Sequence, residues 1–252
     1  MINQITEVNG MKEHIYTIPI NDSFRKDCEC PICEFLKEEE RKLIDYTLGP
    51  SMMEPDERIR SNKTGFCNHH FSMLLNHENK LSLALVLETH LSEIRKIMDE
   101  DIDTINSRKK SVFKKDDILP KITDKYTQIE NSCVICNKLN DITDNFIDNV
   151  IFLYKKEDEF KKKFEASKGF CIPHFTLLLS RAKNNLSGKN LSDFYSVLYK
   201  IELEHLSRIQ EDITWFTKKF DFRFANEDWK TSRDAVIRTT EKISGFITPL
   251  KS

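Results

Sequence analysis

The sequence predicts a mainly α-helical protein that consists of two tandem repeat modules of about three helices each and one further helix at the C-terminal end. Composition, internal repetition and apolar spacing lead to this prediction. The 252 residues include only 6 glycines and 7 prolines, and this scarcity disfavours β-rich folds with many tight turns. Apolar residues make up 39% and charged residues 32%, the balance of an ordered globular chain.

Three sequence blocks occur twice, in the same order. CPICEFL at position 30 returns as CVICNKL at 133, GFCNHHFSMLL at 65 returns as GFCIPHFTLLL at 169, and HLSEI at 90 returns as HLSRI at 205. Such ordered recurrence indicates an internal duplication. We divide the chain into an N-terminal segment with the first module (1–107), a linker (108–130), the second module (131–216) and a C-terminal helical tail (217–252).

Apolar spacing predicts the helices of each module. Leu83, Leu87, His90, Ile94 and Ile97 follow one another at steps of three or four, as on one face of a long helix, and the second copy repeats this pattern from position 194 to 216. A shorter helix is expected after each GFC block and a third after each CxxC pair. In the tail, a helix is expected from 226 to 245, with an asparagine N-cap and a glycine stop.

Each module carries a CxxC pair and a GFCxxH block. Zinc prefers four tetrahedral ligands, with thiolate sulfur and imidazole nitrogen as favoured donors, and a two-residue spacer lets both side chains of a pair reach one ion. Each module is therefore expected to be organised around its own metal site, although spacing alone does not decide whether ligands are exchanged between the modules. The predicted ligands of the two zinc ions are Cys30, Cys33, Cys67 and His70 in the first module and Cys133, Cys136, Cys171 and His174 in the second.

Other uses of these cysteines remain open. Iron or an iron–sulfur cluster is the alternative cofactor, although all-cysteine ligation is commoner for clusters. Dithiol redox chemistry would need only CxxC and would leave CxxH unexplained, and simple cysteine packing would not require eight residues to recur in register. Cys28 and His69 have no counterpart in the second copy, so neither is counted as a ligand.

Two further histidines and one segment are candidates for supporting roles. His90 and His205 lie on the apolar stripes of their helices, and a helical hairpin would return them to the level of the metal site, where each could hydrogen-bond a ligand or pack in the core. The segment SMMEPDERIRSN occurs only in the first copy. It is expected to be a solvated loop or a recognition surface, with candidate residues Glu54, Asp56, Arg58 and Arg60.

Charge and hydropathy exclude several functional classes. The net charge of −2 gives no electrostatic basis for nucleic-acid binding, and no apolar stretch approaches the roughly 20 residues of a membrane span. The N-terminus lacks the basic and apolar regions of a secretory signal. We therefore expect a cytoplasmic protein, in which seven cysteines at motif spacing indicate metal or redox chemistry rather than disulfides.

The segments CPIC, SMMEPDERIRSNKTGFCNHH, LALVLETHL and FDFRFANEDWKTSRDAVIR resemble an uncharacterised family of anaerobic, low-GC Gram-positive bacteria, known only as a domain of unknown function with duplicated CxxC…GFCxxH modules. The resemblance covers most of the chain and implies a bacterial cytosolic protein, but no activity.

The favoured interpretation is a binding or scaffold protein with structural zinc and an unknown protein or small-molecule partner. The alternative is a metal- or thiol-dependent enzyme or sensor with a site near the first module. The sequence carries no nucleophile–base pair, phosphate loop or cofactor fingerprint that would support an enzyme.

Overall fold

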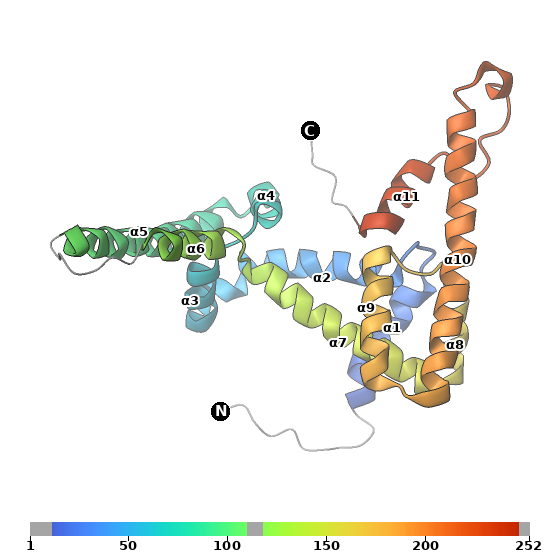
Figure 1. The fold of residues 1–252 in the computed structure, drawn as a ribbon, viewed down its shortest axis with the longest axis horizontal. Helices are drawn as coiled ribbons and strands as arrows, with labels where there is room; N and C mark the ends of the chain where they lie inside the picture. Colours follow the sequence, from blue (N-terminus) through green and yellow to red (C-terminus); the bar gives the residue numbers. More distant parts are fainter. Residues whose placement is uncertain (1–11, 110–117, 247–252) are drawn as a thin grey trace. The chain divides into compact units, whose positions relative to one another are not determined.

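A computed structural model describes residues 12–109 and 118–246 (Figure 1). Helices dominate these residues and no strand occurs among them, which confirms the predicted mainly α fold. The elements are α1 (Lys12–Arg25), α2 (Pro31–Thr47), η1 (Pro50–Met53), α3 (Pro55–Thr64), α4 (Asn68–Asn76), α5 (Lys80–Lys109), α6 (Leu119–Glu130), α7 (Val134–Lys156), α8 (Asp158–Glu165), α9 (Ile172–Asn185), α10 (Gly188–Lys218), η2 (Phe222–Phe224) and α11 (Ala235–Ser244). None of the helices in this part of the chain has the length and apolar character needed to cross a membrane.

The expected helices of each copy are present. The CxxC pairs lead into α2 and α7, the GFC blocks lead into α4 and α9, and the two long apolar stripes lie on α5 and α10. The SMMEPDERIRSN segment, in contrast, is not a loop, because it forms η1 and most of α3. Pro50 and Pro55 stand at the starts of these two helices, where a missing N–H group costs no intrahelical hydrogen bond.

The helix of the tail begins later than predicted. We expected it to start after Asn226, but α11 begins at Ala235 and ends before Gly245, whose φ is +86°. Side chains from the end of α10 and from the residue after it bind the backbone of the segment between α10 and α11. Lys219 Nζ donates to the carbonyls of Phe224 (2.7 Å) and Ala225 (2.9 Å), and Trp215 Nε1 donates to the carbonyl of Asp228 (2.9 Å). These contacts stabilise a turn where local sequence favours a helix start.

The chain divides into two compact units. The first contains Met1–Glu38 and Ile142–Ser252, and the second contains Glu39–Asp141. The boundaries fall inside α2 and α7, so that each unit takes chain from both predicted modules. The division of the chain into modules along the sequence stays a prediction.

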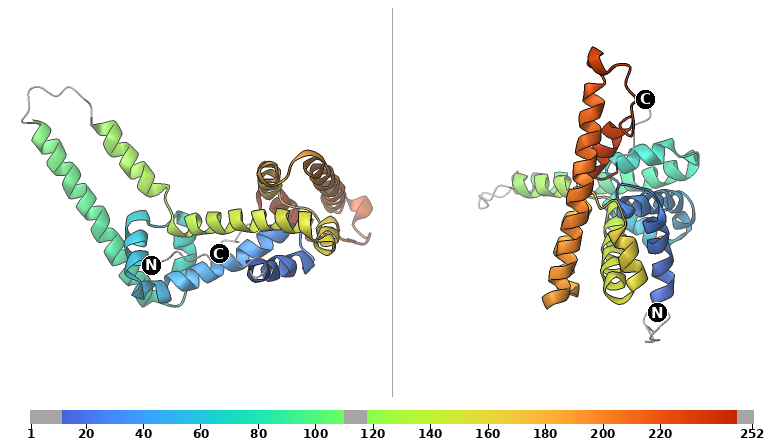
Figure 2. Two further views of the ribbon diagram at one scale, coloured as in Figure 1. Left: turned by 90° about the horizontal axis from the view of Figure 1, so that it is seen from below. Right: turned by 90° about the vertical axis from the view of Figure 1, so that its right-hand side faces the viewer.

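An aromatic cluster forms the core of the first unit. Phe160, Phe164, Phe170 and Phe194 are fully buried, and the Phe164 ring lies 5.2 Å from that of Phe170 and 5.6 Å from that of Phe194. Phe170 belongs to the second GFC block, so this packing fixes the loop before α9 against α10. Helix α11 lies beside α10 in the same unit (Figures 1 and 2).

The core of the second unit forms where α2, α4, α5 and the start of α7 meet. Leu74 of α4 is fully buried, and Leu83 and Val86 of α5 are almost so. The start of α7 is joined to the first GFC loop by a hydrogen bond from the backbone N–H of Val134 to the carbonyl of Gly65 (3.1 Å). The loop that carries one cysteine–histidine pair is therefore fixed to the helix that carries a CxxC pair.

Candidate metal centres

The eight predicted ligands form two clusters, and in each cluster the four candidate atoms lie within 4.8 Å of one another. Both clusters combine the CxxC pair of one copy with the CxxH pair of the other. The grouping expected from the sequence, with each module supplying its own four ligands, is therefore wrong. We call the two clusters site A (Cys30, Cys33, Cys171 and His174, in the first unit) and site B (Cys67, His70, Cys133 and Cys136, in the second unit).

The lengths of α2 and α7 explain the exchange. Cys33 lies in the first turn of α2, which has 17 residues and so carries the chain about 26 Å away at 1.5 Å per residue. Cys136 lies in the first turn of α7, which has 23 residues and a length of about 35 Å. A long helix thus follows each CxxC pair before the chain reaches the next CxxH pair in the sequence.

In site A, three sulfurs surround one imidazole nitrogen. His174 Nδ1 lies 3.4 Å from Sγ of Cys30, 3.3 Å from Sγ of Cys33 and 3.1 Å from Sγ of Cys171. The Sγ atoms of Cys33 and Cys171 are 3.5 Å apart. All three cysteines are buried, with Cys171 fully inaccessible.

Site B has the same donor set. His70 Nδ1 lies 3.2 Å from Sγ of both Cys67 and Cys133 and 3.4 Å from Sγ of Cys136, and the Sγ atoms of Cys67 and Cys136 are 3.8 Å apart. His70 and Cys133 are buried, whereas Cys67 and Cys136 are half-buried.

These distances fit four ligands around one metal ion. Zinc–sulfur bonds of about 2.3 Å and zinc–nitrogen bonds of about 2.0–2.1 Å in a tetrahedron place neighbouring sulfurs about 3.8 Å apart and sulfur about 3.6 Å from nitrogen. The sulfur–nitrogen distances in the two sites run from 3.1 to 3.4 Å and the sulfur–sulfur distances from 3.5 to 3.8 Å. Both clusters can therefore hold a metal ion after small adjustments.

Each site contains one cysteine that is strongly biased towards thiolate. Hydrogen bonds from the thiols of Cys30 and Cys33 lower the pKa of Cys171 to about 4, and the nearby Lys242 charge acts in the same direction. Burial acts to raise the pKa of Cys133, but hydrogen bonds from His70 and from backbone N–H groups outweigh it and lower the pKa to about 6. Thiolate is the form that binds metal, so these two cysteines are prepared for a cation. Hydrogen bonds to neighbouring thiolates raise the pKa of Cys33, and burial raises that of Cys136, so these two thiols would lose their protons when an ion binds.

Glycine is required in both GFC loops. Gly65 has φ +68° and Gly169 has φ +81°, a region that residues with a Cβ rarely adopt. A Cβ at Gly65 would also lie 2.7 Å from Nε2 of His90, and one at Gly169 would lie 2.6 Å from Oε2 of Glu202. The GFC turn is therefore contacted by His90 of α5 in the first copy and by Glu202 of α10 in the second.

His90 and His205 have different environments. His90 Nδ1 donates to the carbonyl of Asn62 (2.7 Å), so that His90 joins α5 to the last turns of α3, which lead to the first GFC loop. His205 Nδ1 accepts from Nε of Arg208 (3.1 Å), and burial, together with the charge of Arg208, lowers the pKa of His205. Neither histidine belongs to a cluster, and a contact of either with a metal ligand stays a prediction.

Glu40 is a site residue that sequence reasoning missed. Its buried carboxylate lies 3.2 Å from Nε2 of His70 and 3.0 Å from Nε2 of His69. The first contact has ion-pair distance without good hydrogen-bond alignment. Burial acts to raise the pKa of Glu40, but the two histidines outweigh it and lower the pKa. A carboxylate on the outer nitrogen of a ligand histidine is the usual way to orient that ring. The only sequence signal is the position of Glu40 two helical turns after Cys33, in the run EEE.

The predicted recognition segment is partly occupied by internal contacts. Arg58 Nη2 donates to Oγ1 of Thr89 (3.1 Å) and to the carbonyl of Leu85 (3.4 Å), which braces α3 against α5. Glu54 accepts from the hydroxyl of Tyr46 (2.8 Å). Asp56 and Arg60 are exposed, and Arg60 pairs with a neighbouring glutamate on α3 at 2.8 Å. A recognition role for the four residues stays a prediction.

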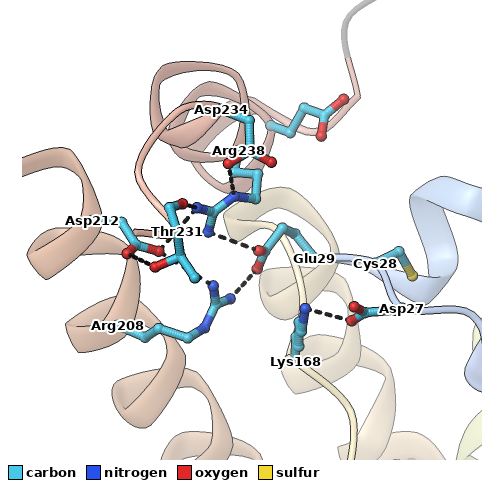
Figure 3. Close-up of a pocket in the computed structure, with 10 residues that line it drawn as sticks. Asp27, Cys28, Glu29, Lys168, Arg208, Asp212, Thr231, Asp234 and Arg238 are labelled. Carbon is cyan, nitrogen blue, oxygen red and sulfur yellow. Dashed lines mark hydrogen bonds and ion pairs between the residues drawn. The ribbon is translucent and has the colours of Figure 1, made fainter. Parts of the chain in front are cut away.

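The first unit also contains a charged pocket of about 560 Å³ (Figure 3). At its centre the buried carboxylate of Glu29 contacts Arg208 Nη2 at 2.5 Å and Arg238 Nη1 at 3.4 Å. Arg238 also binds Asp212 at 2.9 Å. The arginines of α10 and α11 are thus bound to the loop that precedes Cys30, and the pocket is built from internal ion pairs (Figure 3).

Comparison with known proteins agrees with the resemblance noted in the sequence. An "Uncharacterized 23.9 kDa protein in xynA 3'region" of Caldicellulosiruptor sp. (strain Rt8B.4) is 28% identical over 193 residues, which cover 75% of this chain and 84% of that protein. No solved structure matches. The model of a family described as "Family of unknown function (DUF6062)" matches residues 11–249. The chain therefore belongs to this family of unknown function.

Proposed function

We propose that the protein binds two zinc ions, one at site A and one at site B, and that both ions are structural in a helical binding or scaffold protein. The observation that carries this proposal is the pair of clusters, each with three cysteine sulfurs and one histidine Nδ1 within 4.8 Å of one another. Structural zinc sites use four protein ligands, whereas catalytic sites keep one position open for water or substrate. Both clusters are complete four-ligand sets.

The spacing of the ligand atoms favours a single ion over an iron–sulfur cluster. Sulfurs 3.5 to 3.8 Å apart surround a volume that suits one ion, and they leave no space for several irons with their bridging sulfides. A mixed set of thiolate and imidazole in tetrahedral geometry is also typical of zinc.

The positions of the ligands in the chain support a structural role. Site A joins residues 30–33 to residues 171–174, and site B joins residues 67–70 to residues 133–136. An ion at each site would close a long loop of chain and would add its binding free energy to folding.

The test is metal analysis followed by cadmium substitution. Protein purified without oxygen should contain two equivalents of zinc, and Cys28→Ser, which removes a cysteine outside both clusters, should retain both. After exchange with ¹¹³Cd, one cadmium should couple to the β-protons of Cys30, Cys33 and Cys171 and the other to those of the three remaining ligand cysteines. Absence of metal, or an iron–thiolate charge-transfer spectrum, would contradict the proposal.

A further inference from the structure

The two sites differ in how accessible their sulfurs are. At site A all three cysteines are buried, with exposed fractions of 5%, 7% and 0% for Cys30, Cys33 and Cys171. At site B only Cys133 is buried, whereas Cys67 and Cys136 are half-buried. The two half-buried sulfurs are neighbours, with 3.8 Å between their Sγ atoms.

The end of α11 covers site A. Gly245 is buried, and the position of a Cβ on this residue would lie 3.8 Å from Sγ of Cys171 and 3.9 Å from Sγ of Cys33. Lys242, one turn earlier, is 1% exposed, and its Nζ donates to the carbonyl of Lys168 at 2.9 Å. A small recess of about 70 Å³ still adjoins Cys30 and Cys33.

The charged side chains beside the two sites also favour higher reactivity at site B. Beside site A the cation of Lys242 is paired with the carboxylate of Glu202 at 3.2 Å, whereas the carboxylate beside His70 at site B belongs to Glu40. Three thiolates, one neutral imidazole and a zinc ion carry one net negative charge. A lysine that is paired with a carboxylate offsets little of that charge, whereas a carboxylate on the ligand histidine increases electron donation to the ion. Cys67 and Cys136 are therefore more exposed than the three cysteines of site A, and the carboxylate beside His70 makes their thiolates more nucleophilic.

The positions of the cysteines on their helices do not explain the difference in reactivity between sites A and B, because these positions are the same at both sites. Cys67 and Cys171 are the N-cap residues of α4 and α9. Each CxxC pair likewise spans the first turn of its helix, α2 or α7. The helix dipole therefore favours thiolate equally at sites A and B. The features that distinguish site B from site A are the exposure of its cysteines and the charges beside it.

We propose that Cys67 and Cys136 form a redox-reactive dithiol that small-molecule disulfides oxidise with release of the site B ion, while the ion at site A is retained. This inference rests on the proposed metal binding. One thiolate attacks a sulfur of the small disulfide, which forms a mixed disulfide and expels one small thiolate. The second protein thiolate then attacks the mixed disulfide, which forms the Cys67–Cys136 bond and expels the second small thiolate. The two electrons pass to the small disulfide, and site B loses two of its four ligands.

The experiment uses full-length, zinc-loaded protein with Cys28→Ser, which removes the half-buried non-ligand thiol. Dipyridyl disulfide is the probe, because each thiol–disulfide exchange with it releases a coloured pyridinethione. Released pyridinethione and zinc are followed by absorbance, the latter with a metal indicator, and modified cysteines are identified by peptide mapping. The wild-type protein is the matched control, in which Cys28 should add one pyridinethione without releasing zinc.

The expected first phase releases two pyridinethiones and one zinc per chain and yields a Cys67–Cys136 disulfide, about tenfold faster than any reaction at site A, because exchange rates depend on access to the thiolate. Simultaneous loss of both ions, earlier modification of Cys30, Cys33 or Cys171, or zinc release without the Cys67–Cys136 disulfide would overturn the proposal. Protein that contains no metal before the reagent is added would instead refute the proposed metal binding itself.

Discussion

Replacement of Lys242 by methionine should strongly destabilise the first unit. Lys242 is 1% exposed, and its Nζ lies 3.2 Å from Oε1 of Glu202, whose side chain is 4% exposed. The same Nζ approaches the carbonyls of Lys168 at 2.9 Å and Glu29 at 3.5 Å, one in each of the loops that lead to site A. The variant keeps an apolar chain of similar length but leaves the carboxylate of Glu202 buried without its cation.

The structure permits an estimate of the magnitude. Removal of one partner from a buried ion pair costs about 3–5 kcal/mol, because the remaining charge is left uncompensated. Replacement of Glu202 by leucine in addition, which copies Leu87 at the corresponding position of the first repeat, removes that charge. The double variant then leaves the backbone N–H of Phe170, now bound to Oε2 of Glu202 at 2.9 Å, without an acceptor, at a cost of about 1–3 kcal/mol.

The measurement is the free energy of unfolding from urea denaturation in zinc-saturated buffer, with the metal content of each variant determined first so that zinc loss is not mistaken for lost packing. The double variant should be about 2 kcal/mol more stable than the single variant, a coupling typical of contacting residues. A single variant within about 1 kcal/mol of wild type, or a double variant no more stable than the single one, would refute the reasoning.

Three further predictions concern single residues. Glu40→Gln should weaken metal binding at site B by about 10- to 100-fold, measured by competition with a chelator, because the ring of His70 loses its carboxylate partner. Gly65→Ala should lower the free energy of unfolding by more than the roughly 1–3 kcal/mol of backbone strain alone, since the new Cβ meets His90. The pKa of His205, followed by NMR, should lie below 6.5. Because the depressed pKa disfavours protonation of the folded state, this histidine contributes stability above pH 6.5 that is lost as the pH falls.

Matched variants make each prediction decisive. Glu39→Gln changes the neighbouring glutamate, which pairs with Lys42, and should leave the affinity of site B unchanged; an equal effect of both substitutions would exclude a specific role for Glu40. Gly188 has φ +55° with no atom within 4 Å of a Cβ, so Gly188→Ala measures strain without a clash and should cost less than Gly65→Ala. A pKa of His205 above 6.5 would show that burial and the charge of Arg208 do not control this imidazole.

Local patterns in the sequence determined the helices and the chemistry of the sites. Apolar spacing identified the long helices α5 and α10 because helical periodicity is a property of neighbouring residues. The eight cysteines and histidines that the structure brings together were found because CxxC and CxxH are short motifs whose members bind one ion through local geometry alone.

Only the tertiary structure decided which pairs share a site. CxxC and CxxH each act locally, but the pairing between them depends on where α2 and α7 carry the chain, and spacing alone does not contain that information. The same limit hid Glu40, since all three glutamates of EEE look alike until helix α2 turns one of them towards His70. The sequence also does not reveal that His90 lies against the first GFC turn and Glu202 against the second. These contacts depend on the register of a long helix against a loop that is distant in sequence.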